Sequence, residues 1–273
     1  MAYKEYFVYT LSQALTAGAT GIAFDPNTIR IDSDADFEFQ KTTYVSGLTA
    51  NDSNGNDRVN VRYRDDSQGR YLLKDPLDIK MVAGRNTLLM GLSSCFIPFI
   101  WPRPYVISAG TTFTVEMADY SGAGPNIRLA FHGAKVKPGQ APWDRKFRAT
   151  VPFVYGFAAG TGTGFTSGLP SIAANSTKTV PISIDIDSHF LVQKIVAVRT
   201  GDALVSVNEG ARGRDWTNAA IHIDNLCGNG AFPNIMFANR FIFRGSVVNF
   251  NIQNLLGITN VIDIALVGTK LYE

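Results

Sequence analysis

The sequence is poor in the residue types that carry most enzyme chemistry. Its 273 residues include only three histidines and two cysteines. It has no C-x-x-C pair, no histidine pair at zinc spacing and no G-x-S-x-G turn, so neither a zinc site nor a hydrolase nucleophile is predicted. The glycine-rich stretch Gly160–Gly164 lacks the Gly-Lys-Ser/Thr ending of a phosphate-binding loop. We therefore expect no enzyme, no catalytic residues, no metal and no cofactor.

Charge is also scarce. Charged residues make up 18% of the chain and the net charge is +2, which does not favour a nucleic acid as a specific partner. Apolar residues make up 45%, which excludes a disordered chain. The longest apolar run, Cys95–Trp101, is interrupted by Pro98 and is too short to span a membrane. The first ten residues lack the pattern of a signal peptide, so we expect synthesis in a cytoplasm without secretion.

The chain does contain an internal repeat. Residues Gly110–Val136 and Gly245–Leu271 align without a gap, and both alternate apolar and polar residues on either side of a glycine-containing connection. This alternation is typical of strands with one buried face, so each copy is predicted to be a pair of strands that closes a β domain. The identical pairs are Gly110/Gly245, Gly122/Gly257, Ile127/Ile262, Ala130/Ala265, Gly133/Gly268 and Lys135/Lys270.

Shorter echoes extend the repeat towards the N-terminus. Phe7–Tyr9 matches Phe153–Tyr155, and Ile29–Ser33 matches Ile184–Ser188. A third match, of residues 39–41 with 192–194, is two residues out of step and predicts a small length change between the copies. Alanine- and glycine-rich segments at 12–21 and 156–168 are interpreted as loops or extended arms. A turn of helix is expected within 77–83.

These matches predict an all-β protein of two tandem antiparallel β-sandwiches, related by internal duplication. The first, residues 1–140, includes an N-terminal arm, and the second covers residues 141–273. Lys137–Arg148 has two prolines and reads as a connector. Long connections early in each unit and a tight late pair favour a jelly roll, with an immunoglobulin-like sandwich as the rival.

Two groups of residues are candidates for an interface. Arg58, Arg62 and Arg64 alternate along one predicted strand and share a face. Asp65 and Asp66 follow directly, so a solvated or subunit-facing strand fits these arginines better than nucleic acid. The second group combines a tryptophan with two arginines, which is a common composition of binding hot spots: Arg212, Arg214 and Trp216. A Trp216 that caps the end of its own sandwich is the alternative.

Other polar patterns are weaker. His222 and Asp224 share a strand face like a base and its orienting acid, but no serine is placed by the sequence as their nucleophile. Asp32–Asp36 begins like a calcium loop, yet Phe37 and Thr43 stand where an EF-hand needs glycine and glutamate. A calcium ion held by a β loop there stays open. Cys95 and Cys227 are expected to be buried free thiols, although a disulfide between them is not excluded.

The order of features within each unit points to a family. A strand ends in glycine (Val82–Gly84, Leu226–Gly228), a proline-containing apolar crossing follows, and an I-x-x-G entry (Ile107–Gly110, Ile242–Gly245) leads to the closing strand pair with its Gly-x-Lys ending. This pattern resembles the tandem jelly-roll structural proteins of tailed bacteriophage virions that form collars, decorate heads or anchor fibres. The resemblance covers most of both units and brings no catalytic residues.

The resemblance implies a non-enzymatic virion protein that forms homo-oligomers and binds other capsid, neck or fibre proteins. One alternative is a small double-jelly-roll major capsid protein of a tailless virus. A second is a glycan-binding fibre or lectin module, with Trp101, Trp143 and Trp216 as stacking platforms. A cupin-type metal enzyme is disfavoured, because its site needs clustered histidines.

Overall fold

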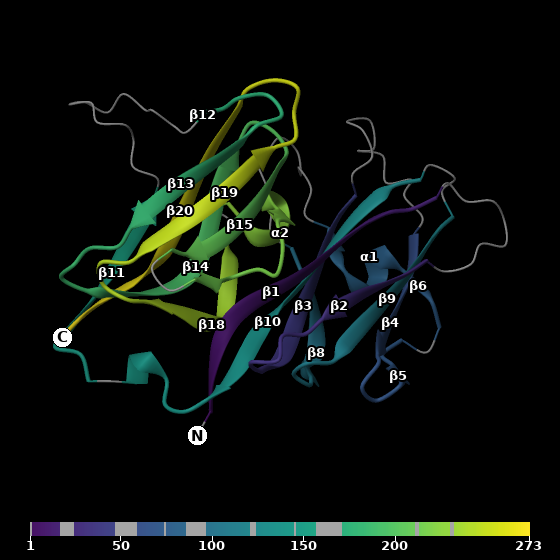
Figure 1. The fold of residues 1–273 in the computed structure, drawn as a ribbon, viewed down its shortest axis with the longest axis horizontal. Helices are drawn as coiled ribbons and strands as arrows, with labels where there is room; N and C mark the ends of the chain where they lie inside the picture. Colours follow the sequence, from purple (N-terminus) through teal and green to yellow (C-terminus); the bar gives the residue numbers. More distant parts are fainter. Residues whose placement is uncertain are drawn as a thin grey trace. The chain divides into compact units, whose positions relative to one another are not determined.

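The computed structural model describes residues 2–16, 25–46, 59–73, 75–85, 97–120, 124–144, 146–156, 171–210, 213–229 and 232–273. Within these ranges the regular structure consists almost entirely of β-strands in antiparallel sheets (Figure 1). The predicted all-β fold is therefore confirmed. The two α-helices of the described residues are single turns, so neither has the length or the apolar character of a membrane span.

The chain divides into two compact units. The N-terminal unit holds the described residues between 8 and 137. The C-terminal unit holds residues 138–273 together with residues 2–7 at the start of the chain. Strand β1 (Ala2–Ala14) therefore contributes its first residues to the C-terminal unit and the rest to the N-terminal unit. The sequence had assigned this whole N-terminal arm to the first domain.

The N-terminal unit has two sheets, and successive long strands alternate between them. In the first sheet the order is β1, β10 (Asn126–Pro138), β3 (Asp36–Ser46), β7 (Gly84–Arg85), and β8 (Phe99–Ile107) also pairs with β3. In the second sheet the order is β2 (Asp25–Arg30), β9 (Thr112–Asp119), β4 (Val59–Asp65), β5 (Arg70–Tyr71), and β6 (Leu77–Asp78) also pairs with β4. The predicted helical turn is α1 (Ile79–Val82). Asp78 precedes it, and the Asp78 side chain accepts a hydrogen bond from the Lys80 backbone N–H.

The C-terminal unit repeats this arrangement. Its first sheet runs β11 (Ala149–Gly156), β20 (Asn260–Tyr272), β14 (His189–Arg199), β18 (Asn234–Ile242), and β12 (Ser171–Ile172) also pairs with β20. Its second sheet runs β13 (Thr177–Ser183), β19 (Val247–Asn254), β15 (Ala203–Glu209), β16 (Arg214–Asp215), and β17 (Ile221–His222) also pairs with β15. A turn of helix, α2 (Ile223–Leu226), follows β17, and the 3₁₀ turn η2 (Pro142–Asp144) precedes β11.

A bulge at the same place explains one pair of identical glycines. Gly133 of β10 lies opposite Phe39, and the residue before it lies opposite Lys41, so one residue of β3 is skipped. Gly268 of β20 shows the same shift against β14. A Cβ on Gly133 would lie 2.5 Å from the Glu38 carbonyl oxygen, and one on Gly268 would lie 2.0 Å from the Leu191 carbonyl oxygen. Only glycine allows this close approach of the backbones.

The structure corrects the alignment of the early strands. The Ile31 N–H donates to the Thr111 carbonyl at 2.9 Å, and the Ile184 N–H donates to the Ser246 carbonyl at the same distance. Ile31 rather than Ile29 is thus the counterpart of Ile184. With this shift, the match of Ile31 with Ile184 and the match of residues 39–41 with 192–194 have the same spacing. The length change expected between these two matches is therefore wrong.

Each unit buries its own core between its sheets. Val59, Val61 and Tyr63 of β4 point inward, as their alternation predicted. In the N-terminal unit aromatic rings fill much of the space, and Phe113 and Phe131 meet edge to face at 5.2 Å. The segments expected to be strands in the closing pairs are strands, β9 and β19. The finer prediction, that each unit is a jelly roll derived by duplication, stays a prediction.

Candidate functional site

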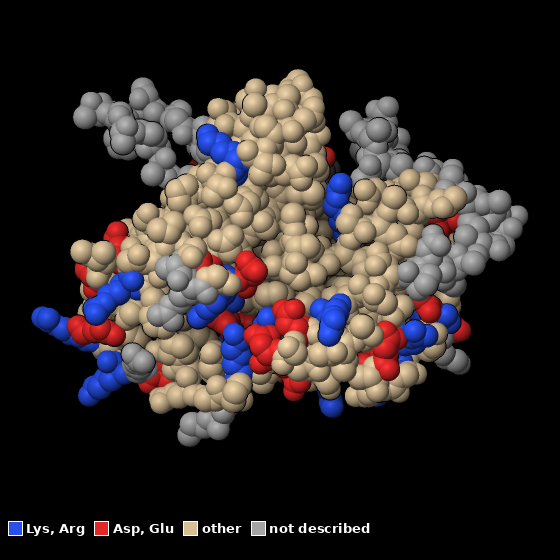
Figure 2. Space-filling model, in the orientation of Figure 1, with Lys and Arg blue, Asp and Glu red and all other residues tan. Residues whose placement is uncertain are grey.

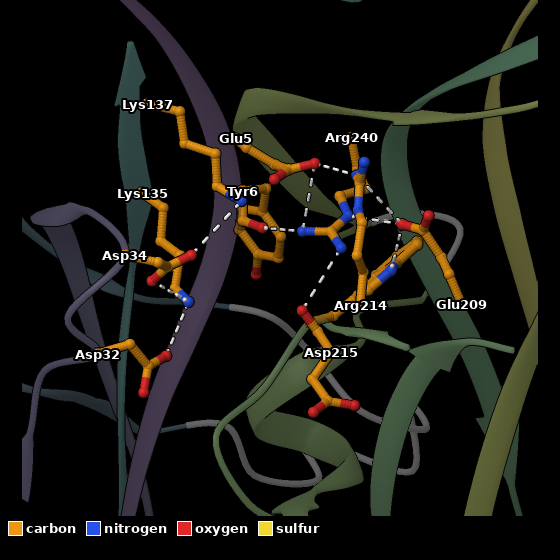
Figure 3. Close-up of polar contacts among 11 residues, drawn as sticks. Glu5, Tyr6, Asp32, Asp34, Lys135, Lys137, Glu209, Arg214, Asp215 and Arg240 are labelled. Carbon is orange, nitrogen blue, oxygen red and sulfur yellow. Dashed lines mark hydrogen bonds and ion pairs between the residues drawn. The ribbon is translucent and has the colours of Figure 1, made fainter. Parts of the chain in front are cut away.

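A cluster of four charged side chains lies inside the C-terminal unit (Figure 3). Arg240 of β18 is 2% exposed, and its Nε donates to the Glu209 carboxylate of β15 at 2.9 Å. Its Nη1 lies 3.6 Å from Glu5 of β1 and donates to the Tyr6 carbonyl at 3.2 Å. Arg214 of β16 pairs with Glu5 and, at 3.5 Å, with Glu209. The cluster therefore fixes the start of β1 on β15, β16 and β18.

The charges of this cluster balance. Burial lowers the pKa of Arg240, while the neighbouring charges of Glu5 and Glu209 raise it. Two carboxylates and two guanidinium groups leave no net charge, which is the condition for keeping ions in a protein interior. All four groups hold chain segments together. A structural role is the one that this geometry supports.

A tyrosine, an aspartate and a lysine form a second, repeated arrangement. In the N-terminal unit the Asp32 N–H donates to the Tyr9 hydroxyl at 2.9 Å, and Lys135 Nζ lies 2.7 Å from the Asp32 carboxylate. In the C-terminal unit the Tyr155 hydroxyl donates to Asp185 at 3.1 Å, and Lys270 pairs with the same carboxylate. The identical lysines of the Gly-x-Lys endings thus pair with an aspartate that follows β2 or β13, and this aspartate in turn contacts the tyrosine of the first strand.

The lysines also set the acidity of these carboxylates. The hydrogen bond from Lys270 holds the pKa of Asp185 below its usual value. Burial lowers the pKa of Lys270, but the hydrogen bonds and charges of Asp185 and Tyr155 together outweigh it and raise that pKa to about 12. Partial burial raises the pKa of Asp34, yet Lys135 and Lys137 outweigh this effect and hold the pKa low.

Lys135 also contacts two of the aspartates at which the sequence left a calcium ion open. Asp32 and Asp34 accept from Lys135, and Asp36 accepts the backbone N–H of Ala109 at 2.9 Å. An ammonium group thus occupies the place that a cation would take. Among the described residues, no group of three histidine, cysteine, aspartate or glutamate side chains is arranged to hold a metal ion.

The structure places the predicted arginine face in ion pairs within its own unit. Arg62 pairs with Glu116 of β9 at 2.6 Å and lies over the Tyr71 ring at 4.3 Å. Arg64 pairs with Asp66 at 2.7 Å. Arg58 lies outside the described residues. On the face shown in Figure 2, positive and negative side chains are interspersed rather than gathered into a patch of one sign.

The expectation of an exposed Trp216 is wrong. Its side chain is fully buried, its ring nitrogen donates to Glu209 at 3.2 Å, and the Arg240 guanidinium lies 5.4 Å from its ring. The alternative, a tryptophan that packs inside its own unit, is the one observed. Arg214 belongs to the buried cluster, and Arg212 lies outside the described residues. No sequence signal indicated this burial, because Arg240 and Glu5 come from distant strands.

The remaining polar candidates are also part of the fold. The His222 ring accepts the Asp224 backbone N–H at 3.3 Å and so caps α2, while Asp224 is held by Arg199. His222 is buried, as a capping residue rather than an accessible base. Cys227 is a buried free thiol, and burial raises its pKa. Cys95 and most of the two glycine-rich segments lie outside the described residues.

Two equivalent edge strands differ in exposure. β1 and β11 each form the first strand of their sheet, and each carries the sequence Phe-Val-Tyr. Phe7, Val8 and Tyr9 are at most 3% exposed. On β11, Phe153 is 37% and Val154 is 55% exposed, and Val151 is 43% exposed. Among the described residues β11 is therefore an edge strand with exposed apolar side chains, which proteins avoid unless something pairs with it.

A shallow depression of about 280 Å³ lies beside η2 in the C-terminal unit. The half-buried Trp143 forms part of it and meets Tyr3 edge to face at 5.8 Å. Polar side chains complete the rim. The lining residues are Ala2, Tyr3, Lys4, Ala141, Trp143, Asp144, Ala238 and Asn239.

No protein-family profile matches the chain, and no curated protein matches it. Solved structures that resemble it include N-glycanase F, at 10% identity and a TM-score of 0.27, covering 97% of this chain and 95% of the other. A glycosylasparaginase from Flavobacterium meningosepticum gives 10% identity, a TM-score of 0.23 and 95% coverage of both chains. The tandem CBM22 domains of Paenibacillus barcinonensis Xyn10C give 10%, 0.19 and 99% of both. Similarities this low carry no argument about the function of the chain.

Proposed function

We propose that this chain is a non-enzymatic structural protein of a bacteriophage virion, built from two jelly-roll units, which assembles with copies of itself and binds other virion proteins. The observation that carries the proposal is the uncovered apolar edge of β11. Val151, Phe153 and Val154 are exposed together on a strand whose second edge has no partner among the described residues. Such an edge fits a protein whose native state is an assembly.

The polar groups support the same function. Several buried ionisable side chains of both units hold strands together, as the Arg240 cluster and the Lys135 and Lys270 pairs show. Contacts of this kind stabilise the fold, which is the role that a structural protein requires of them. Within the virion we place the protein at a collar or on the head surface; a major capsid protein of a tailless virus is the alternative, and the copy number per particle separates the two.

The test is the mass of the purified full chain in solution. We expect light scattering to give a multiple of the 29.7 kDa chain mass at high protein concentration, and negative-stain images to show closed rings or a regular lattice. A monodisperse monomer at the highest soluble concentration would contradict the proposal.

The depression beside η2 favours glycan binding as a second candidate function. An aromatic ring with carboxylate, amide and ammonium groups around it is a composition that suits a sugar. Trp216 is buried and takes no part. A glycan array with the wild-type protein and the Trp143→Ala variant tests this: we expect a bound glycan whose signal the variant loses, and an array without any signal removes the candidate.

A further inference from the structure

The start of β1 shows how a first strand is covered in this protein. Within the C-terminal unit, Glu5 contacts Arg240 and Arg214, and the Tyr6 hydroxyl accepts a hydrogen bond from Asn234 at 3.0 Å. The receiving surface consists of β18 with the adjoining parts of β15 and β16. We call it the receiving surface of the C-terminal unit. It buries Glu5 and Tyr6 almost completely.

The N-terminal unit has the same surface on β8, β4 and β5. The register fixes the equivalence, because Glu209 lies opposite Arg214 in one unit and Asp65 lies opposite Arg70 in the other. Tyr105 stands where Arg240 stands: its hydroxyl donates to Asp65 at 2.9 Å, as Arg240 donates to Glu209. Phe99, the first residue of β8, corresponds to Asn234, the first residue of β18.

This second receiving surface is open. Phe99 and Tyr105 are half-exposed, and Arg70 is exposed. Ile100 and Val106 of the same strand are also exposed, but they alternate with Phe99 and Tyr105 and face the other side of the sheet. The equivalent residues of the C-terminal unit, Asn234 and Arg240, are at most 2% exposed, so the aromatic surface on β8 is uncovered where its counterpart is covered.

The residues of β11 match this surface pair by pair. The common Phe-Val-Tyr sequence puts Val151 at the position of Glu5 and Pro152 at the position of Tyr6. The ionic pair Glu5–Arg240 is thus replaced on both sides, by Val151 and Tyr105. The polar pair Tyr6–Asn234 is also replaced on both sides, by Pro152 and Phe99. The carboxylate of Glu5 and the guanidinium of Arg240 are thus both absent from the contact of Val151 with Tyr105. Neither side of this apolar contact therefore buries an unpaired charge.

We propose that β11 of one copy docks on the β8 receiving surface of a second copy, in the way that the start of β1 is covered within the C-terminal unit. The inference rests on the proposed function and deepens it by naming both sides of the contact. Each copy then offers one strand and one surface, which is a heterologous, head-to-tail interface. Such a contact closes into a ring when the rotation between copies allows it, and extends as a filament when it does not.

The sign of a charge at position 151 gives a sharp test. In the docked state, residue 151 lies near Arg70 of the second copy, as Glu5 lies near Arg214. Val151→Lys places two cations together, and we expect the dissociation constant of the assembly to rise at least about tenfold. Val151→Glu supplies a carboxylate to Arg70 and retains the assembly. Because residue 151 is exposed, neither variant should alter the far-ultraviolet circular dichroism of the chain.

Rescue and a matched control complete the experiment, which uses sedimentation velocity of the full chain over a range of concentrations. The double variant Val151→Lys/Arg70→Glu restores the pair with reversed charges and should regain the wild-type distribution. Ile258→Lys, which adds the same charge at a residue 69% exposed in the same unit, should sediment like the wild type.

Three results would overturn the inference or its basis. If the wild type assembles and Val151→Lys assembles equally well, the interface lies elsewhere while the proposed function stands. If Val151→Lys weakens assembly but Arg70→Glu gives no rescue, β11 is an interface strand whose partner is not the β8 surface. If the wild type is a monomer at every concentration, the proposed function fails as well.

Discussion

The edge strands β1 and β11 carry the same three residues in the same place of two similar units, yet Phe7 and Val8 are buried whereas Phe153 and Val154 are exposed. The difference lies outside the Phe-Val-Tyr sequence. Glu5 and Tyr6 precede it on β1 and reach Arg240 and Asn234, whereas Val151 and Pro152 precede it on β11. A strand of this fold is therefore covered or uncovered according to what the residues beside it can pair with, and the repeat alone does not decide this.

The largest effect is expected from removing the side chain that holds the start of β1 in the C-terminal unit. Arg240→Ala leaves the Glu5 and Glu209 carboxylates buried without the guanidinium between them. We expect a loss of about 3–5 kcal/mol in the free energy of unfolding, measured by denaturant titration. Arg244→Ala is the control, because its pair with Glu273 is exposed and should contribute less than about 1 kcal/mol. Equal losses in both variants would contradict the role of the buried cluster.

The next largest effect is expected when residues at the start of β1 and on its partner strand are replaced by their counterparts from β11 and β8. Glu5→Val leaves Arg240 with one carboxylate fewer and should cost about 3 kcal/mol by the same titration. Adding Arg240→Tyr reproduces the Val151 and Tyr105 combination inside one chain. The double variant should then lose clearly less than the sum of the two single losses. Additive losses would show that the two pairs are not equivalent.

A smaller effect is expected from the bulge that both units share. Gly268→Ala brings a Cβ to within 2.0 Å of the Leu191 carbonyl oxygen, and the backbones must separate. We expect about 1–3 kcal/mol of destabilisation. Gly257→Ala, with no atom within 4 Å of the added Cβ, is the matched control and should leave the thermal midpoint unchanged. An unaffected Gly268→Ala variant would remove the bulge as the reason for the identical glycines.

The smallest effect concerns the pair of Lys270 with Asp185. Because the pKa of Asp185 is lowered in the folded state, the pair stabilises the protein above about pH 4, the unfolded value, and this contribution is lost as the pH falls through the folded value. Lys270 has a raised pKa, so its contribution is present at neutral pH and is lost as the pH rises through about 12.

Asp185→Asn should therefore cost less than about 1 kcal/mol at pH 7, because the carboxylate is half-exposed and screened by solvent. The difference from the wild type should shrink as the pH falls below 4 in denaturant titrations. A difference that stays constant with pH would indicate that the loss is one of packing rather than of charge.

Much of the fold could be predicted from the sequence. The alternation in Gly110–Val136 and Gly245–Leu271 predicted β9, β10, β19 and β20, and the matched Gly-x-Lys endings marked the lysines that close each unit. The alignment failed at Ile29, because the segment Ile29–Asp32 contains two isoleucines at strand spacing and either one fits the pattern. Only the hydrogen bonds of Ile31 and Ile184 distinguish them.

The candidate site could be predicted far less well. Trp216 beside arginines had the composition of an exposed hot spot, but its ring contacts Glu209 at the end of β15 and Arg240 on β18, and neither contact follows from the local sequence. The exposure of β11 had no sequence signal for the same reason. Burial depends on which distant residues meet a strand, and a local pattern does not contain that information.

Hydrogen exchange of the two Phe-Val-Tyr segments, followed by mass spectrometry as the protein concentration rises, tests the central claim most directly. The account predicts that the protection of Phe7–Tyr9 is the same at every concentration, while that of Phe153–Tyr155, whose backbone already pairs with β20, increases as the assembly forms. Protection of Phe153–Tyr155 that stays unchanged while the sedimenting mass increases would contradict it.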